Sequence, residues 1–216
     1  MLFRSLASLY RGGRVEHGEL RELPPLPAAQ TELEQMRTAL GSGNALLLTG
    51  AKAREATVRK MDLSSYSVLA FATHGLIADE IDGLAEPALV LTPPATNSPD
   101  DDGLLTASEI AALNLNADFV ILSACNTAAG STQSAPAYTG LAHAFLYAGA
   151  RSLLLSHWQV RDDAAERLSV ATVRGTAEGQ DRAAALREAM LDLMKDRNIP
   201  DSAHPAIWAP FILIGQ

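Results

Sequence analysis

The chain has 216 residues, of which 48% are hydrophobic, and a formal net charge of −8. This length suits one domain with a sizeable core, and the acidic balance argues against a nucleic-acid partner. The single cysteine excludes an internal disulfide, and no apolar run is long enough for a secretion signal or a membrane span, so we expect a cytoplasmic protein without membrane contact.

The first half of the chain begins with an irregular segment, residues 1–27, which ends in a proline-rich linker. Apolar residues spaced three or four apart then predict helices, and continuous apolar runs predict buried strands. The expected elements are a helix over 28–40, a strand over 43–49, a helix over 51–61 and a strand over 68–72.

The second half alternates strands and helices. Thr106 and Glu109 predict a capping box at a helix start. The expected strands are 88–92, 118–123, 152–156 and 211–214, and the other expected helices are 138–148, 164–175 and 182–196. This order of elements predicts an α/β protein with a mainly parallel sheet and helices on both faces.

Two of these strands end in residues with reactive side chains. His74 follows the strand over 68–72, and Cys125, 51 positions later, follows the strand over 118–123. Chemistry in an open α/β sheet collects beyond the carboxyl ends of the strands. If the two strands are parallel neighbours, the imidazole and the thiol face one crevice, as a cysteine nucleophile and its general base require.

Several motifs occur in order along the chain, from about residue 25 to its end. They are Phe71–Gly75 (FATHG), Gly103–Ile110 (GLLTASEI), Leu122–Ala128 (LSACNTA), Gly140–Arg151 (GLAHAFLYAGAR), Ser156–Asp162 (SHWQVRD), His204-Pro205 and Trp208–Phe211 (WAPF). In these motifs the chain resembles the CHAT domain, a caspase- and separase-like family of cysteine peptidases that is often fused to tetratricopeptide repeats.

The resemblance implies a caspase-like three-layer sandwich over 28–216, with a mainly parallel central sheet flanked by helices. It also implies a cysteine endopeptidase that cleaves a protein or peptide substrate in a regulated bacterial signalling, defence or cell-death system. Cys125 would be the nucleophile and His74 the general base and acid, with no cofactor and no metal. The backbone N–H groups of Gly75 and Cys125 are the natural donors to the oxyanion.

Substrate preference is expected to depend on an acidic pair, Asp162 and Asp163, which follows the strand over 152–156. A carboxylate in a partly desolvated pocket favours arginine or lysine before the cut, and the resemblance to separase points the same way. The alternative is that Asp162 caps the helix that starts near Ala164.

The sequence departs from the family pattern in two respects. His157 and Gln159 replace a usual Leu and Pro, and the further upstream strands of the family, including a P-D-G segment, are missing. We therefore expect the C-terminal part, or a short version, of a CHAT protein with an open sheet edge. Such an edge invites pairing with another chain, including a second copy in a homodimer. A sensor or repeat-domain partner would lie outside this chain.

Two other functions are weighed against the peptidase. The first is a latent signalling or scaffold module that keeps the dyad but needs a partner or a missing segment. The second is a nucleotide-binding domain, but the chain lacks a G-x-G-x-x-G turn and a P-loop. Acidic residues after His74, at 79, 80 and 82, lack partners at metal-ligand spacing, so we expect an exposed loop there.

Overall fold

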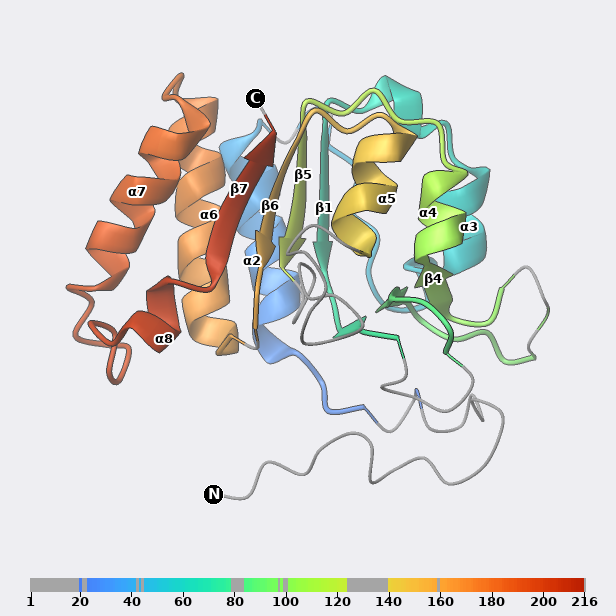
Figure 1. Ribbon diagram of the computed structural model, residues 1–216, viewed down its shortest axis with the longest axis horizontal. Coiled ribbons are helices and arrows are strands. Elements are labelled where there is room, and N and C mark those ends of the chain that lie inside the picture. The colour runs from blue at the N-terminus through green and yellow to red at the C-terminus, as the bar shows by residue number, and fades with distance from the viewer. Residues whose placement is uncertain are drawn as a thin grey trace.

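A four-stranded sheet forms the centre of the protein. The computed structural model describes residues 20, 23–41, 43, 45–78, 84–96, 98, 101–123, 140–158 and 160–215. The strands of this sheet, in the order β1-β5-β6-β7, are β1 (Val68–Ala72), β5 (Phe119–Ser123), β6 (Ser152–Ser156) and β7 (Phe211–Gly215). The first three are parallel and β7 is antiparallel to β6. In Figure 1 the arrowheads of β1, β5 and β6 point one way and the arrowhead of β7 points the other way. The predicted, mainly parallel sheet is confirmed.

A second, smaller sheet continues directly from β1. Its antiparallel strands, in the order β2-β3-β4, are β2 (Gly75–Leu76), β3 (Ala88–Val90) and β4 (Leu104–Thr106). The Val90 amide donates to the His74 carbonyl at 2.9 Å. The backbone on both sides of His74 is therefore held by strands, β1 before it and β2 after it.

Helices cover both faces of the central sheet, as Figure 1 shows. The helix bounds are α2 (Pro27–Ala39), α3 (Glu55–Lys60), α4 (Ala107–Ala111), α5 (Leu141–Ala148), α6 (Asp162–Ala177), α7 (Arg182–Leu193) and α8 (Pro205–Trp208), with 3-10 turns at Gly50–Lys52 and Leu63–Ser65. The first, α2, lies with α6 and α7 on one face, and α3, α4 and α5 lie on the other. This arrangement is the expected three-layer sandwich.

Alternation along β5 divides the core between the two faces. Val120 and Leu122 pack in a cluster with residues of α4 and α5, whereas Phe119 and Ile121 pack in a second cluster with α2, α6 and α7. All four side chains are at most 2% exposed. Because burying each such side chain contributes roughly 1.5–3 kcal/mol, β5 is firmly fixed at the centre of the sheet.

The predicted capping box is confirmed at the start of α4. The Thr106 side chain accepts from the Glu109 amide, and the Thr106 amide donates to Glu109 Oε2 at 2.9 Å. Two backbone N–H groups at the start of this short helix, those of Thr106 and Glu109, are therefore hydrogen-bonded to side chains.

The strand predicted over 43–49 is wrong: residues 45–49 have no regular secondary structure, and 42 and 44 lie outside the described residues. The apolar run is present, but no described strand pairs with it. A strand exists only where a neighbour satisfies its backbone.

The helix predicted over 51–61 is also too long, because α3 begins only at Glu55. Gly50 adopts a φ of +52° and starts a 3-10 turn instead. The Ala53 carbonyl then accepts from the Thr92 amide at 2.8 Å, which ties this stretch to the loop after β3 rather than to a helix. None of the described helices is long and apolar enough to cross a membrane.

Candidate active site

The strands that precede His74 and Cys125 are parallel neighbours. Their register pairs Ala72 at the end of β1 with Ser123 at the end of β5. His74 follows Ala72 by two positions, and Cys125 follows Ser123 by two. Cys125 itself lies outside the described residues. The arrangement of strands on which the dyad prediction depended is present, and the dyad stays a prediction.

The His74 imidazole is held by a backbone carbonyl from the linker before α2. Its Nε2 lies 2.8 Å from the Pro24 carbonyl oxygen. A carbonyl oxygen can only accept, so this bond assigns the proton of the neutral ring to Nε2. Nδ1 is then left as the ring's acceptor, which is the role that a general base needs.

A small cavity lies at the carboxyl ends of β1, β5 and β6. Its volume is about 30 Å³, enough for a water molecule. The polar side chains that line it come from four elements and the residues after β1, and they are Glu32, Thr73, His74, Ser123, Ser156 and Asp162. Two predicted site residues, His74 and Asp162, therefore lie at one hollow.

Glu32 of α2 is the residue of this cavity that sequence reasoning missed. Its side chain is 3% exposed and accepts a hydrogen bond from Ser169 Oγ of α6 at 2.5 Å. Burial raises the pKa of this carboxyl to about 7, against hydrogen bonds from Ser169 and Ser123 that lower it, and the nearby Glu166 and Asp162 raise it further. A signal existed in the sequence, because Glu32 lies one helical turn before the buried Met36.

The structure separates the roles of Asp162 and Asp163. Burial raises the pKa of the Asp162 carboxyl, the nearby His74 lowers it and the nearby Asp163 raises it, so Asp162 lies within electrostatic reach of His74. Asp163 instead pairs with Arg161 at 2.6 Å and accepts from the Ala164 amide at 2.9 Å. Those contacts hold the pKa of Asp163 below its usual value.

The helix-cap alternative for Asp162 is therefore not what the structure shows. The helix begins at Asp162 itself, two positions before the predicted start, and its N-cap is Arg161. The carboxylate that accepts from a first-turn amide belongs to Asp163. Asp162 is left to face the cavity.

Gly75, the expected oxyanion donor, is the first residue of β2. It is buried and pairs with Leu89 of β3. The Thr73 side chain donates to the Val90 carbonyl, which ties the residue before His74 to the same strand. The chain around the imidazole is thus fixed from both directions.

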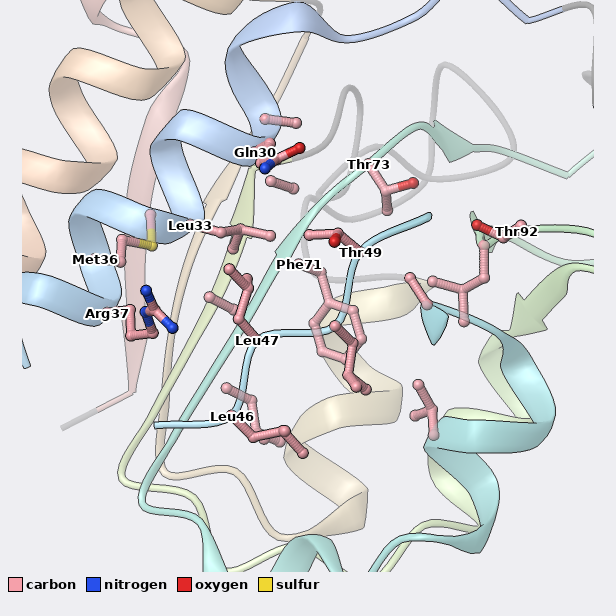
Figure 2. A pocket seen from close by; sticks show the side chains of 18 of the residues that line it. Gln30, Leu33, Met36, Arg37, Leu46, Leu47, Thr49, Phe71, Thr73 and Thr92 are labelled. Carbon is pink, nitrogen blue, oxygen red and sulfur yellow. The ribbon is translucent and has the colours of Figure 1, made fainter. Parts of the chain in front are cut away.

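A much larger hollow, of about 910 Å³, runs along β1. Figure 2 shows its walls, with Leu33 and Met36 from α2, Leu46 and Leu47 from the extended segment 45–49, and Phe71 from β1. We call it the β1 groove. Its lining is mostly apolar, and it meets the small cavity at Thr73 and His74, which line both.

The fold defines an α/β protein of the caspase-like type, with a mostly parallel central sheet flanked by helices. The sequence model of the CHAT domain matches residues 15–216, and the chain belongs to the CHAT domain family. It is also similar to tetratricopeptide repeat protein 28 of Mus musculus and of Homo sapiens, with 34% identity over 113 residues in each. That alignment covers 52% of this chain but 4% of each relative.

Proposed function

We propose that this protein is a cysteine endopeptidase whose dyad is His74 and Cys125. The observation that carries the proposal is the register of β1 and β5, which pairs Ala72 with Ser123. Each reactive residue stands two positions beyond that pair. Neighbouring strands are about 4.8 Å apart, so two side chains at matching positions beyond such a pair are within reach of each other.

The bond from His74 Nε2 to the Pro24 carbonyl supports Nδ1 as the ring nitrogen that takes part in catalysis. Nδ1 accepts the thiol proton of Cys125, and the thiolate attacks the carbonyl carbon of the scissile peptide. The imidazolium then gives that proton to the leaving amine, and a thioester remains. Water, deprotonated by Nδ1, attacks the thioester and releases the acid and the thiol.

Charge at the cavity supports a substrate with arginine or lysine before the cut. Asp162 and Glu32 both line the hollow beside His74. A cationic side chain that enters there would exchange water for a charge-assisted bond to Asp162 and a hydrogen bond to the Glu32 carboxyl. Asp163 is excluded from this role in the proposal, because Arg161 already occupies its carboxylate.

The first experiment is cleavage of a fluorogenic peptide library in which the residue before the cut is varied. We expect turnover that is lost in Cys125→Ala and that is highest with arginine or lysine. Turnover that survives in Cys125→Ala would refute the dyad. An apolar preference would refute the acidic pocket and leave the dyad standing.

A latent module that needs a partner is the second candidate, and the size of the cavity favours it. A volume of about 30 Å³ holds a water molecule and is far too small for an arginine side chain. The pocket must therefore open before such a substrate binds. Thiol alkylation separates the two cases: a dyad-activated Cys125 reacts fast near neutral pH, whereas a latent one reacts like an ordinary thiol until a partner, such as a tetratricopeptide-repeat domain, is added.

A further inference from the structure

The contacts of Ser169 call for a proton on the Glu32 carboxyl. Ser169 Oγ lies 2.5 Å from Glu32 Oε1 and 2.7 Å from the carbonyl oxygen of Ala165. A serine hydroxyl has one proton to donate, and a carbonyl oxygen can only accept. The two contacts are hydrogen bonds at the same time only when Glu32 supplies a second proton and donates it to Ser169. This geometry agrees with the raised pKa of Glu32, about 7.

The surroundings of Glu32 are acidic on the side of the cavity. Helix α6 presents Asp162 and Glu166 to it, β5 presents the Ser123 hydroxyl, and His74 lines the same hollow from the residues after β1. Among the described residues, the groups that act on the Glu32 charge include no arginine or lysine. A second negative charge beside Asp162 would therefore be buried without a cation, which costs free energy. A cation that enters the hollow would supply the missing partner.

The two carboxyls of the cavity come from opposite walls. Glu32 belongs to α2 and Asp162 to the start of α6, and these helices pack side by side on one face of the sheet (Figure 1). The hollow between them, of about 30 Å³, holds a water molecule. A guanidinium that parts these walls meets one carboxyl on each, and its planar set of N–H donors suits such a pair.

We propose that Glu32 is a specificity-determining residue that exchanges its proton for the cationic side chain of the substrate. The inference rests on the proposed function and deepens it, because that function requires only a hydrogen bond to the Glu32 carboxyl. When the cation enters, the O–H bond of the carboxyl breaks, the proton passes to solvent water, and the carboxylate pairs with the cation beside Asp162. Ser169 then donates its one proton to the carboxylate.

The preference for a cation should therefore strengthen as the pH rises through neutrality. At pH 6 most of the free protein carries the Glu32 proton, which an entering cation has to displace, whereas at pH 8 the carboxylate is already formed. A cation that lowers the pKa of Glu32 to about 5 would bind roughly tenfold more tightly at pH 8 than at pH 6. At pH 6.5 each binding event would release about 0.7 proton.

Isothermal titration calorimetry with two matched probes tests the exchange. The probes are n-butylguanidine, a cation, and n-butylurea, a neutral molecule of nearly the same shape. Titrations in phosphate and in Tris, which differ in ionisation enthalpy, give the number of protons released. We expect n-butylguanidine to show the tenfold rise in affinity and the proton release, and n-butylurea to show neither. Wild-type protein that fails to bind n-butylguanidine at pH 8, or that binds it at pH 6.5 without releasing a proton, would overturn the proposal.

Variants assign the released proton to a residue. Glu32→Gln should lose about 0.7 proton of release at pH 6.5 and most of the rise in affinity, and Glu34→Gln, an exposed carboxyl on the same helix, should lose neither. His74 also changes charge near neutral pH and stays in both variants, so its share remains in Glu32→Gln. If Glu32→Gln does not fold, Glu32→Met takes its place. Release that is unchanged in the Glu32 variant would assign the proton to another group and refute the exchange.

Peptide cleavage separates a failure of this inference from a failure of the proposed function. The ratio of kcat/KM for arginine over leucine before the cut cancels the titration of the dyad, which both peptides share. We expect this ratio to rise roughly tenfold from pH 6 to pH 8 in the wild type and to stay constant in Glu32→Gln. Cleavage after arginine with a constant wild-type ratio would keep the peptidase and remove the exchange. Proton-releasing binding of n-butylguanidine without any cleavage would keep the cation site and remove the peptidase.

Discussion

Two hollows meet at His74, and they differ in almost every property. The β1 groove has about 910 Å³ and mostly apolar walls, whereas the cavity on the other side has about 30 Å³ and six polar side chains. The larger one follows the side of a strand, and the smaller one lies where three strands end. The larger hollow borders β1, which pairs with β5 alone within the described residues, and the smaller one lies where chemistry collects in an α/β sheet.

The contrast also assigns different energies to the two hollows. Apolar walls that remain in contact with water forgo the free energy that their burial would contribute. A buried carboxyl such as Glu32 costs free energy that no apolar contact recovers, and such groups are common at functional sites. We therefore expect substitutions in the groove to lower stability at every pH. Substitutions in the cavity should alter activity and the pH dependence of stability.

The largest expected effect is on catalysis at the cavity. His74→Ala should lower kcat/KM for peptide cleavage by about 10³-fold, because it removes the proposed proton acceptor. The control is His143→Ala, an exposed histidine on α5. Steady-state kinetics on one fluorogenic peptide measure both. Equal activity in the two variants would place the general base elsewhere.

The pH dependence of stability should come from Glu32. Its pKa is about 7 in the folded protein against an ordinary 4.5, so between these values the folded state binds more protons than the unfolded state. The proton on Glu32 therefore contributes to the stability of the folded state. This contribution is fully present below pH 4.5 and is lost as the pH rises through 7. The free energy of unfolding should fall by about 3 kcal/mol over that window.

Urea unfolding of Glu32→Gln at several pH values checks this expectation. The variant should lose the pH-dependent fall and be more stable than the wild type near pH 8. The matched control is Glu34→Gln, an exposed carboxyl on the same helix. A slope unchanged by Glu32→Gln would assign the titration to another group.

Phe71 tests the groove itself. Its ring packs on Phe145 with centroids 5.5 Å apart, and it lines the groove. Phe71→Ala should lower the free energy of unfolding by about 2–3 kcal/mol and spare the chemistry. Tyr147→Ala, at an aromatic position that is 83% exposed, should cost less than about 0.5 kcal/mol. A loss of kcat without a loss of stability would contradict the division between the two hollows.

The smallest effect concerns substrate choice. Asp162→Asn should reduce the preference for arginine over leucine before the cut by roughly tenfold, because one charge-assisted bond becomes a neutral one. Asp163→Asn should leave that preference unchanged and lower stability by less than about 1 kcal/mol, because it removes the charge that pairs with Arg161 at the start of α6. If the two variants exchanged these effects, the proposed pocket would be misassigned.

The sequence predicted the fold well where burial decides the structure. The strand bounds of β1 and β6 agree with the prediction to the residue, because a continuous apolar run between polar ends leaves one solution. The run over 43–49 also contains a continuous apolar stretch, residues 45–48, but its described part, 45–49, is not a strand. Pairing depends on a neighbour, and composition does not say whether the neighbour is present.

The candidate site was predictable only in part, for a similar reason. His74 and Asp162 follow strand ends, which a sequence reveals. Glu32 lies in the middle of a helix, and only the packing of α2 against α6 through Ser169 brings it to the cavity. The carbonyl of Pro24, 50 residues before His74, leaves no side-chain signal at all. Long-range contacts of this kind arise from packing and from backbone atoms.

The bond between Pro24 and His74 has a mechanical consequence. Pro24 belongs to the run Leu23-Pro24-Pro25-Leu26-Pro27, whose proline rings fix successive backbone angles and make it stiff. A stiff run transmits a pull along the chain instead of absorbing it. A displacement of this run therefore moves the carbonyl oxygen that His74 Nε2 contacts, and that contact sets the tautomer of the imidazole.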